Sequence, residues 1–280
     1  IAVIGGGPAG LMAAEVLSQG GAQVDLYDAM PSVGRKFLLA GKGGMNITHS
    51  EAYDAFVARY SGREREVARW LEAFDAAAVR EWIHGLGVET FVGSSGRVFP
   101  TDMKAAPLLR AWLHRLRESG VHLDMRHRWL GWRGDKLLFD TPDGEAEAQA
   151  DAVVLALGGG SWKRLGSDGA WVPLLQAKAV DVAPLRPANC GFDVDWSAHF
   201  SSRHAGEPLI TVAVTSRDAA GQLTRKKGQF VVTGTGVEGS LIYALSAALR
   251  DQVEAEGSTT IWLDLLPDLP AGRVADEVAH

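Results

Sequence analysis

The chain has 280 residues, of which 46% are hydrophobic and 22% are charged. This composition is typical of a globular protein, and the length allows one to three folding units. The net charge of -6 argues against nucleic-acid binding, which depends on clustered lysine and arginine. The single cysteine excludes an intrachain disulfide, and the chain has no metal-ligand spacing, so we expect no metal site and a reducing, cytoplasmic setting. No apolar run approaches the roughly 20 residues of a membrane span, so no membrane partner is expected.

The first 28 residues predict a strand, a glycine turn, a helix and a second strand. The expected ranges are 1–4, 11–20 and 22–27 for the three regular elements. A strand, helix and strand in this order indicate an α/β fold with a parallel sheet. Because the chain starts within a predicted strand and stops within a predicted helix, we also expect residues beyond both ends.

The later elements follow from hydrophobic periodicity and turn residues. Residues 30–50 are a long loop and residues 91–102 a turn-rich stretch. Helices are predicted at 64–72, 75–86, 104–119, 168–179, 240–250 and from near 270. Strands are predicted at 121–125, 129–132 and 136–139, which would form a β-meander, at 152–157 in the main sheet, and at 259–263. Residues 189–233 predict several short strands, which begin a second, β-rich unit.

The turn at residues 5–10 carries a Gly-x-Gly-x-x-Gly pattern between a strand and a helix. Gly5 makes the tight turn, Gly7 lets the backbone approach a pyrophosphate, and Gly10 lets the helix pack closely on the sheet. Pro8 and Ala9 lie in the turn just before the helix, whose free amides and partial positive charge at its N-terminus favour phosphate. Taken alone, such a glycine pattern is often only a turn without a ligand.

An acidic residue stands where a dinucleotide site needs one. Asp28 lies 23 positions after Gly5, at the end of the second predicted strand, where its carboxylate can accept hydrogen bonds from ribose hydroxyls. The alternative is a surface acid at a strand end. We therefore place Asp28 and the adjacent Ala29 at the predicted dinucleotide site.

The loop that follows favours FAD over NAD. A plain NAD domain is expected to enter its next helix soon after the acid, whereas residues 34–48 form a long, cationic, glycine-rich loop. Such a loop can offer charge to a pyrophosphate and amides to a flavin ring. The cofactor contacts predicted in it are Gly34, Arg35, Lys36, Gly43, Gly44 and Asn46. A glycine-rich surface loop is the alternative.

A third motif lies at the tip of the buried strand predicted at 152–157. Its residues are Ala156, Leu157, Gly158 and Gly159, and small residues there let a ligand pass over the carboxyl ends of the strands. Taken alone, the motif could be a strand-terminating turn. We also place Trp129 near the adenine of the predicted dinucleotide.

The order of these motifs, together with residues 96–101, 166–169 and 233–239, resembles the bacterial flavoprotein family called HI0933-like or BaiN-like, from residue 1 to about 265. The resemblance implies FAD, with NAD(P)H as a further expected co-substrate. It also implies a Rossmann-type FAD-binding domain over 1–182, an inserted β-rich domain over 183–265 and the start of a helical lid over 266–280. The family's closing FAD segment would lie beyond residue 280.

Two positions depart from the family pattern. Gly44 and Met45 stand where the family commonly has arginine and cysteine, and His49 stands where an asparagine is common. These differences indicate a subgroup with its own substrate.

The expected function is hydride transfer between flavin and a small organic substrate. Asn46 and His49 are the candidate catalytic residues, although the more common role of a histidine in such a loop is to cap the loop or to face water. The alternative function is a dinucleotide-binding module that senses or binds a partner without turnover. The sequence indicates neither the substrate nor the oligomeric state.

Overall fold

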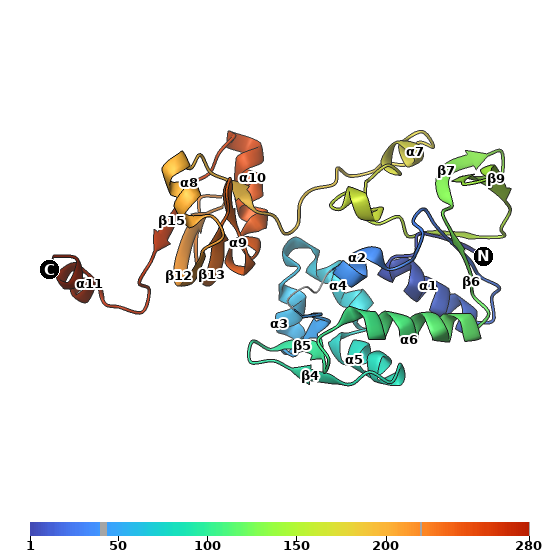
Figure 1. The fold of residues 1–280 in the computed structure, drawn as a ribbon, viewed down its shortest axis with the longest axis horizontal. Helices are drawn as coiled ribbons and strands as arrows, with labels where there is room; N and C mark the ends of the chain where they lie inside the picture. Colours follow the sequence, from blue (N-terminus) through green and yellow to red (C-terminus); the bar gives the residue numbers. More distant parts are fainter. Residues whose placement is uncertain (40–43, 219, 280) are drawn as a thin grey trace. The chain divides into compact units, whose positions relative to one another are not determined.

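The computed structural model describes residues 1–39, 44–218 and 220–279 (Figure 1). The chain divides into two compact units, Ile1–Ala183 and Pro184–His280. Each unit contains at least one sheet and a hydrophobic core of its own. Within the described ranges, no helix combines the length and the apolar character that crossing a bilayer requires.

The main sheet of the first unit has four strands in the order β10-β1-β2-β6, and every neighbouring pair is parallel. The strands are β1 (Ala2–Ile4), β2 (Asp25–Asp28), β6 (His122–Met125) and β10 (Val153–Leu155). This arrangement confirms the predicted α/β fold. The prediction that 121–125 belongs to the β-meander is wrong, because β6 pairs with β2 after a helical crossover.

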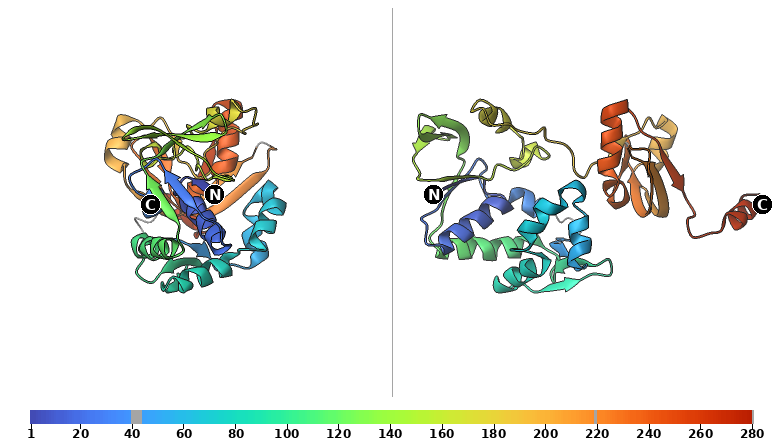
Figure 2. Two further views of the ribbon diagram at one scale, coloured as in Figure 1. Left: turned by 90° about the vertical axis from the view of Figure 1, so that its right-hand side faces the viewer. Right: turned by 180° about the vertical axis from the view of Figure 1, so that it is seen from behind.

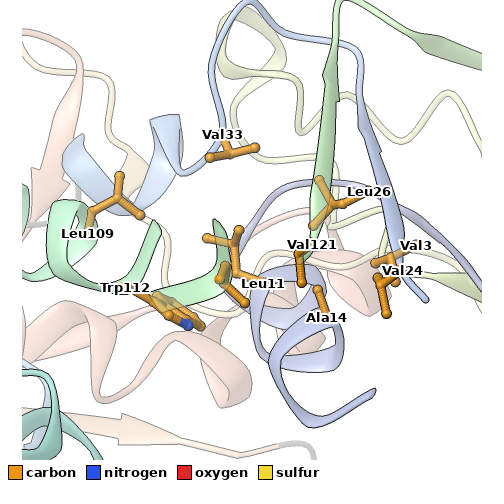
Figure 3. Packing of buried hydrophobic residues seen from close by; sticks show 10 residues of the cluster. Val3, Leu11, Ala14, Val24, Leu26, Val33, Leu109, Trp112 and Val121 are labelled. Carbon is orange, nitrogen blue, oxygen red and sulfur yellow. The ribbon is translucent and has the colours of Figure 1, made fainter. Parts of the chain in front are cut away.

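Two helices cover one face of this sheet. They are α1 (Pro8–Gln19) and α6 (Ala105–Glu118), which run side by side in Figures 1 and 2. Successive side chains of a strand point to opposite faces, so Val3 points toward the helices. Figure 3 shows Val3 in a cluster with Leu11 of α1 and Trp112 of α6. This cluster fixes α1, and with it the glycine turn, against the sheet.

An antiparallel meander covers the opposite face. Its strands are β7 (Arg128–Arg133), β8 (Lys136–Thr141) and β9 (Gly144–Ala148). Ala2 and Ile4, which point away from the helices, form a second core cluster with Trp129, Leu137 and Phe139. The first unit therefore has three layers, with the carboxyl ends of the parallel strands free at one edge.

Shorter elements surround these layers. The turn-rich stretch 91–102 contains most of a hairpin, which was not predicted, and only the middle of the helix predicted at 168–179 is helical. The short elements are α2 (Arg35–Leu39), β3 (Thr48–His49), α3 (Tyr53–Ala58), a 3-10 turn (Ser61–Arg63), α4 (Glu64–Leu71), α5 (Ala76–Gly85), β4 (Thr90–Val92), β5 (Arg97–Pro100), a 3-10 turn (Lys163–Leu165) and α7 (Val172–Gln176).

A buried carboxylate ties α1 to α5 and α6. Glu15 is 2% exposed and accepts hydrogen bonds from the indoles of Trp82 (3.1 Å) and Trp112 (2.6 Å) and from Arg115 (2.9 Å). Two indoles and one guanidinium therefore offset the cost of burying this charge.

Replacing Glu15 with glutamine should lower the free energy of unfolding by about 2 kcal/mol. The glutamine amide carries no charge, and its NH2 group, itself a donor, would face one of the donors that surround the carboxylate. Urea unfolding measures this change. Glu118→Gln on α6 is the matched control, because its carboxylate is 66% exposed and pairs with the exposed side chain of His114. We expect little change for the control. Equal stability of both variants would refute the structural role of Glu15.

The second unit is built on a five-stranded sheet in the order β11-β14-β13-β12-β15, with antiparallel neighbours. Its core packs Val214 and Phe230 of the sheet against Ile242 and Leu249. The helix predicted at 240–250 is two helices. The elements are β11 (Phe192–Asp193), α8 (Ala198–His204), β12 (Pro208–Arg217), β13 (Leu223–Val232), β14 (Gly236–Glu238), α9 (Ser240–Tyr243), α10 (Ser246–Glu256), β15 (Ile261–Asp264) and α11 (Ala271–Ala279).

Candidate dinucleotide-binding site

A cavity of about 580 Å³ opens in the first unit, where β1, β2 and β10 end and α1 begins. Its volume lies in the range of small-molecule sites. Most of the residues predicted to bind the cofactor line it. From the first half of the sequence these are Gly5, Gly7, Pro8, Asp28, Ala29, Gly34, Arg35 and Lys36. The later ones are Trp129, Ala156, Leu157, Gly158 and Gly159.

The glycines of the turn have different roles. A Cβ on Gly5 would lie 2.3 Å from the carbonyl oxygen of Ala156, and its φ of +110° also disfavours a side chain. A Cβ on Gly10 would lie 1.8 Å from the carbonyl oxygen of Gly5. At Gly7, by contrast, a Cβ would meet nothing within 4 Å. Gly5 and Gly10 therefore allow close packing, and the space beside Gly7 is open at the helix N-terminus.

Asp28 lines the cavity and also holds the glycine turn. Its Oδ2 accepts a hydrogen bond from the Gly6 amide at 2.6 Å, and its Oδ1 accepts one from the Met30 amide at 2.7 Å. Burial raises the pKa of Asp28 above its ordinary value, and these two bonds together with the charges of Arg35 and Arg128 offset only part of the rise. Each carboxylate oxygen can accept a second hydrogen bond.

Lowering the pH should weaken dinucleotide binding through Asp28. Only the ionised carboxylate accepts hydrogen bonds on both oxygens, and the raised pKa brings its protonation to a higher pH than for an ordinary aspartate. The loss should approach tenfold per pH unit below that pKa, because one proton is taken up on release. Calorimetric titrations from about pH 7 to about pH 4 measure it.

The effect of Asp28 on stability has the opposite sign. A folded-state pKa above the unfolded value means that the folded chain binds the proton more readily, so this contribution to stability is present at low pH and is lost as the pH rises through the folded pKa. Asp28→Asn should remove both dependences. If the affinity of the Asn variant kept the pH slope of the native chain, a different group would be responsible.

Three cationic side chains line the cavity, and they differ in their hydrogen-bond partners. Lys36 donates to the hydroxyl of Ser161 at 2.8 Å, and Arg128 pairs with Asp168 at 3.2 Å. Arg35 is different, because its buried Nε has no hydrogen-bond partner among the described residues. Arg35 begins α2, where Gly34 donates its amide to the carbonyl oxygen of Gly6, so its position is fixed next to the glycine turn.

Two more buried donors in the cavity wall have no partner in the described part of the chain. They are the indole Nε1 of Trp129 and the hydroxyl of Ser167, and each residue is 7% exposed. Buried polar groups in proteins are almost always paired. A cavity with orphaned donors, an open helix N-terminus and a carboxylate fits an anionic ligand that also carries hydroxyl groups, as a dinucleotide does.

Four other predicted cofactor contacts that the structure describes do not line this cavity. Ala9 and Gly10 lie in the first turn of α1, where Gly10 contacts the sheet. Gly44 and Asn46 belong to the loop after α2, and Gly44 packs against Met103. Gly43 lies outside the described residues.

His49 lies in β3, and both of its ring nitrogens have partners. Nε2 is 3.0 Å from the carbonyl oxygen of Ser95, and Nδ1 accepts from the Glu51 amide at 3.2 Å. A Cβ on Gly96 would also lie 2.6 Å from the imidazole. These contacts support the alternative that His49 caps a loop.

Sequence reasoning missed several cavity residues. Met30, Arg128, Ser167 and Asp168 line the cavity but were not predicted to bind the cofactor. For Ser167 and Asp168, the one signal in the sequence was the pair of glycines that flank them, Gly166 and Gly169. Both glycines have positive φ in the structure.

The parallel sheet, the glycine turn and the cavity at the carboxyl ends of the strands define a Rossmann-type domain. The chain belongs to the family described as HI0933-like protein Rossmann domain, whose model matches residues 1–254. This match confirms the predicted family.

A curated relative from Clostridium scindens, a 3-dehydro-bile acid delta(4,6)-reductase, is 28% identical over 283 residues. The alignment covers 98% of this chain and 66% of the relative, so the chain spans just under two thirds of the relative's length.

Two solved structures show the same fold. One is a 3-ketosteroid-delta4-(5alpha)-dehydrogenase from Rhodococcus jostii RHA1, with a TM-score of 0.50 and 14% identity over 64% of this chain and 53% of that one. The other is a flavocytochrome c3 fumarate reductase, with a TM-score of 0.51 and 17% identity over 75% of this chain and 46% of that one. At these identities the likeness concerns the fold alone.

Proposed function

We propose that the complete protein is an FAD-dependent oxidoreductase that transfers a hydride between the flavin and a small organic substrate, with NAD(P)H as the reductant. One observation carries this proposal. The open N-terminus of α1, Asp28 and Arg35 all line one cavity, and the buried Nε of Arg35 has no hydrogen-bond partner within the described ranges. Membership of the family and the reductase among its relatives support it.

Each of these groups has a defined task in the proposal. The amides that open α1 and the guanidinium of Arg35 bind the pyrophosphate, and Asp28 accepts hydrogen bonds from the ribose. Bound FAD supplies two-electron chemistry at its flavin ring. Because the ring carries the chemistry, this chain's residues chiefly hold and orient the cofactor.

A second hollow supports a site for the flavin end. This apolar hollow of about 340 Å³ shares Pro8 and Phe37 with the main cavity. Met45 and Ile47, which flank Asn46 in the sequence, line it. A dinucleotide that extends from the cavity past Pro8 would therefore approach the loop that contains Asn46, which we propose as a contact of the flavin ring.

The domain arrangement belongs to the same proposal. We assign the FAD-binding Rossmann-type domain to residues 1–182, an inserted β-rich domain to 183–265 and the start of a helical lid to 266–280. The antiparallel sheet of the second unit and α11 after it support this assignment.

The test uses the complete protein, purified without added flavin. We expect a yellow preparation that releases FAD on denaturation, and whose flavin is bleached by NADH or NADPH without oxygen. Reoxidation by a 3-dehydro-bile acid is the first substrate assay, since the reductase relative is named for such a compound. A colourless protein that takes up no FAD would contradict the proposal. Bound flavin that no reductant or substrate changes would favour a binding module without turnover.

A further inference from the structure

Residues 161–164, which we call the rim turn, stand beside the main cavity. The chain lines the cavity through Gly159 before the turn and through Leu165 after it, whereas the four residues of the turn do not line it. Lys36, which lines the cavity, donates to the hydroxyl of Ser161 in the turn at 2.8 Å. The rim turn therefore lies at the edge of the cavity and outside its wall.

The rim turn carries two cations without counter-ions. Lys163 and Arg164 are exposed, and neither has an ion pair or a side-chain hydrogen bond with any residue that the structure describes. Residues 152–167 contain no aspartate or glutamate, and the first acid after them, Asp168, pairs with Arg128 at 3.2 Å. In a chain with a net charge of -6, the rim turn is therefore a local place that attracts anions.

An aromatic side chain stands next to these cations. Trp162 is 50% exposed, and its indole has neither a ring partner nor a hydrogen-bond partner within the described ranges. Its backbone, by contrast, is fixed, because it exchanges hydrogen bonds with Ser167 at 3.0 and 3.2 Å and accepts one from the amide of Leu165 at 2.9 Å. An exposed indole on a fixed backbone is suited to stack against a planar base.

We propose that the rim turn binds the adenosine end of NADPH, with Trp162 stacked on the adenine and with Lys163 and Arg164 at the 2′-phosphate. This inference rests on the proposed function and selects NADPH over NADH as the reductant. In NADPH one ribose carries both the adenine and the 2′-phosphate, just as one turn carries the indole and the two cations. A phosphate monoester has up to about two negative charges near neutral pH, which two unpaired cations match.

NADH offers the rim turn less than NADPH does. It has the same adenine, so it keeps the contact with Trp162, but it has a neutral ribose hydroxyl in place of the phosphate. Lys163 and Arg164 therefore distinguish the two reductants, and Trp162 contributes to both. The proposed FAD contacts Asp28 and Arg35 line the cavity, whereas the rim turn does not, so its variants should keep FAD.

The test uses the complete protein with its flavin oxidised and titrates it by calorimetry with NADP⁺ and NAD⁺, which then bind without turnover. The native protein should bind NADP⁺ at least about tenfold more tightly than NAD⁺. Replacing both Lys163 and Arg164 with glutamine should weaken NADP⁺ binding about tenfold and NAD⁺ binding less than about twofold. Trp162→Ala should weaken the binding of both about tenfold, and Trp162→Phe, which keeps a ring, should retain most of the affinity.

Helix α4 supplies the matched controls. Trp70 is 70% exposed, follows the cation Arg69, and lines neither the cavity nor the second hollow. Trp70→Ala and Arg69→Gln should each leave both affinities within about twofold of the native values. The flavin absorbance of every variant shows whether FAD is still bound.

Several results would overturn the inference. Equal native affinities for NADP⁺ and NAD⁺, or a native preference in the double glutamine variant, would remove the phosphate contact. Loss of FAD from a rim-turn variant would make the turn part of the flavin site. Native NADP⁺ affinity with weakened binding of a 3-dehydro-bile acid would assign the turn to the organic substrate. A complete protein that retains no FAD would contradict the proposed function, whereas one that retains FAD without preferring NADP⁺ contradicts this inference alone.

Discussion

Replacing Gly10 with alanine is expected to lower the free energy of unfolding by about 3 kcal/mol and to abolish dinucleotide binding. The new Cβ would lie 1.8 Å from the carbonyl oxygen of Gly5 and 3.3 Å from Cβ of Ala156. The first of these neighbours is backbone, so α1 must move away from the sheet. The helix-propensity gain of about 1 kcal/mol for alanine over glycine is too small to offset that movement.

Urea unfolding and calorimetric titration with FAD measure the two effects of Gly10→Ala. Gly20→Ala, at the other end of the same helix, is the control. Its Cβ would make only ordinary contacts, at 3.4 and 3.5 Å, and its φ is -75°. We expect that variant to keep nearly native stability and binding. Native stability of Gly10→Ala would mean that α1 does not approach the sheet as described.

Replacing Gly7 with alanine is expected to weaken binding about 100-fold, or about 2.7 kcal/mol, and to leave the fold intact. Gly7 has φ -79° and ψ -179°, an extended conformation that alanine adopts freely, and the added Cβ would meet nothing within 4 Å. The methyl group would instead occupy the space through which a phosphate approaches the amides of α1.

The same two measurements apply to Gly7→Ala. The loss of stability should stay below about 1 kcal/mol, the usual cost of a poorer N-cap. If the variant bound FAD as tightly as the native chain, the pyrophosphate would not lie at the start of α1. The contrast between Gly7 and Gly10 therefore separates the ligand-facing role of this turn from its packing role.

The glycine turn and Asp28 could be predicted from the sequence because they are local features. A strand, a tight turn and a helix place Gly5, Gly7 and Gly10 within a few residues, and the end of the next strand brings Asp28 beside them. The second role of Asp28, which is to hold the Gly6 amide, was not visible from its spacing. It depends on the path of the backbone through the turn.

Features that depend on distant parts of the chain were harder to predict. The alternation of apolar and polar residues at 121–125 indicates a strand but does not determine which strand it pairs with. β6 pairs with β2 because α6 carries the chain back to the parallel sheet. Ser167 and Asp28 line the same cavity, and Gly166, next to Ser167, packs against Met30, more than a hundred residues earlier in the sequence. No local pattern encodes that contact.

The predicted catalytic candidates show the same limit. Asn46 and His49 stand close together in a loop without periodicity, so their spacing does not determine where either side chain points. The structure places the His49 ring between Ser95 and Glu51. Only a folded hairpin could reveal those partners.

A crystal structure of the complete protein with FAD tests the central claim most directly. We predict that pyrophosphate oxygens lie about 3 Å from the amides that open α1, and that a ribose hydroxyl donates to Asp28. A pyrophosphate bound elsewhere, with the start of α1 open to water and Asp28 bonded only to Gly6 and Met30, would contradict it.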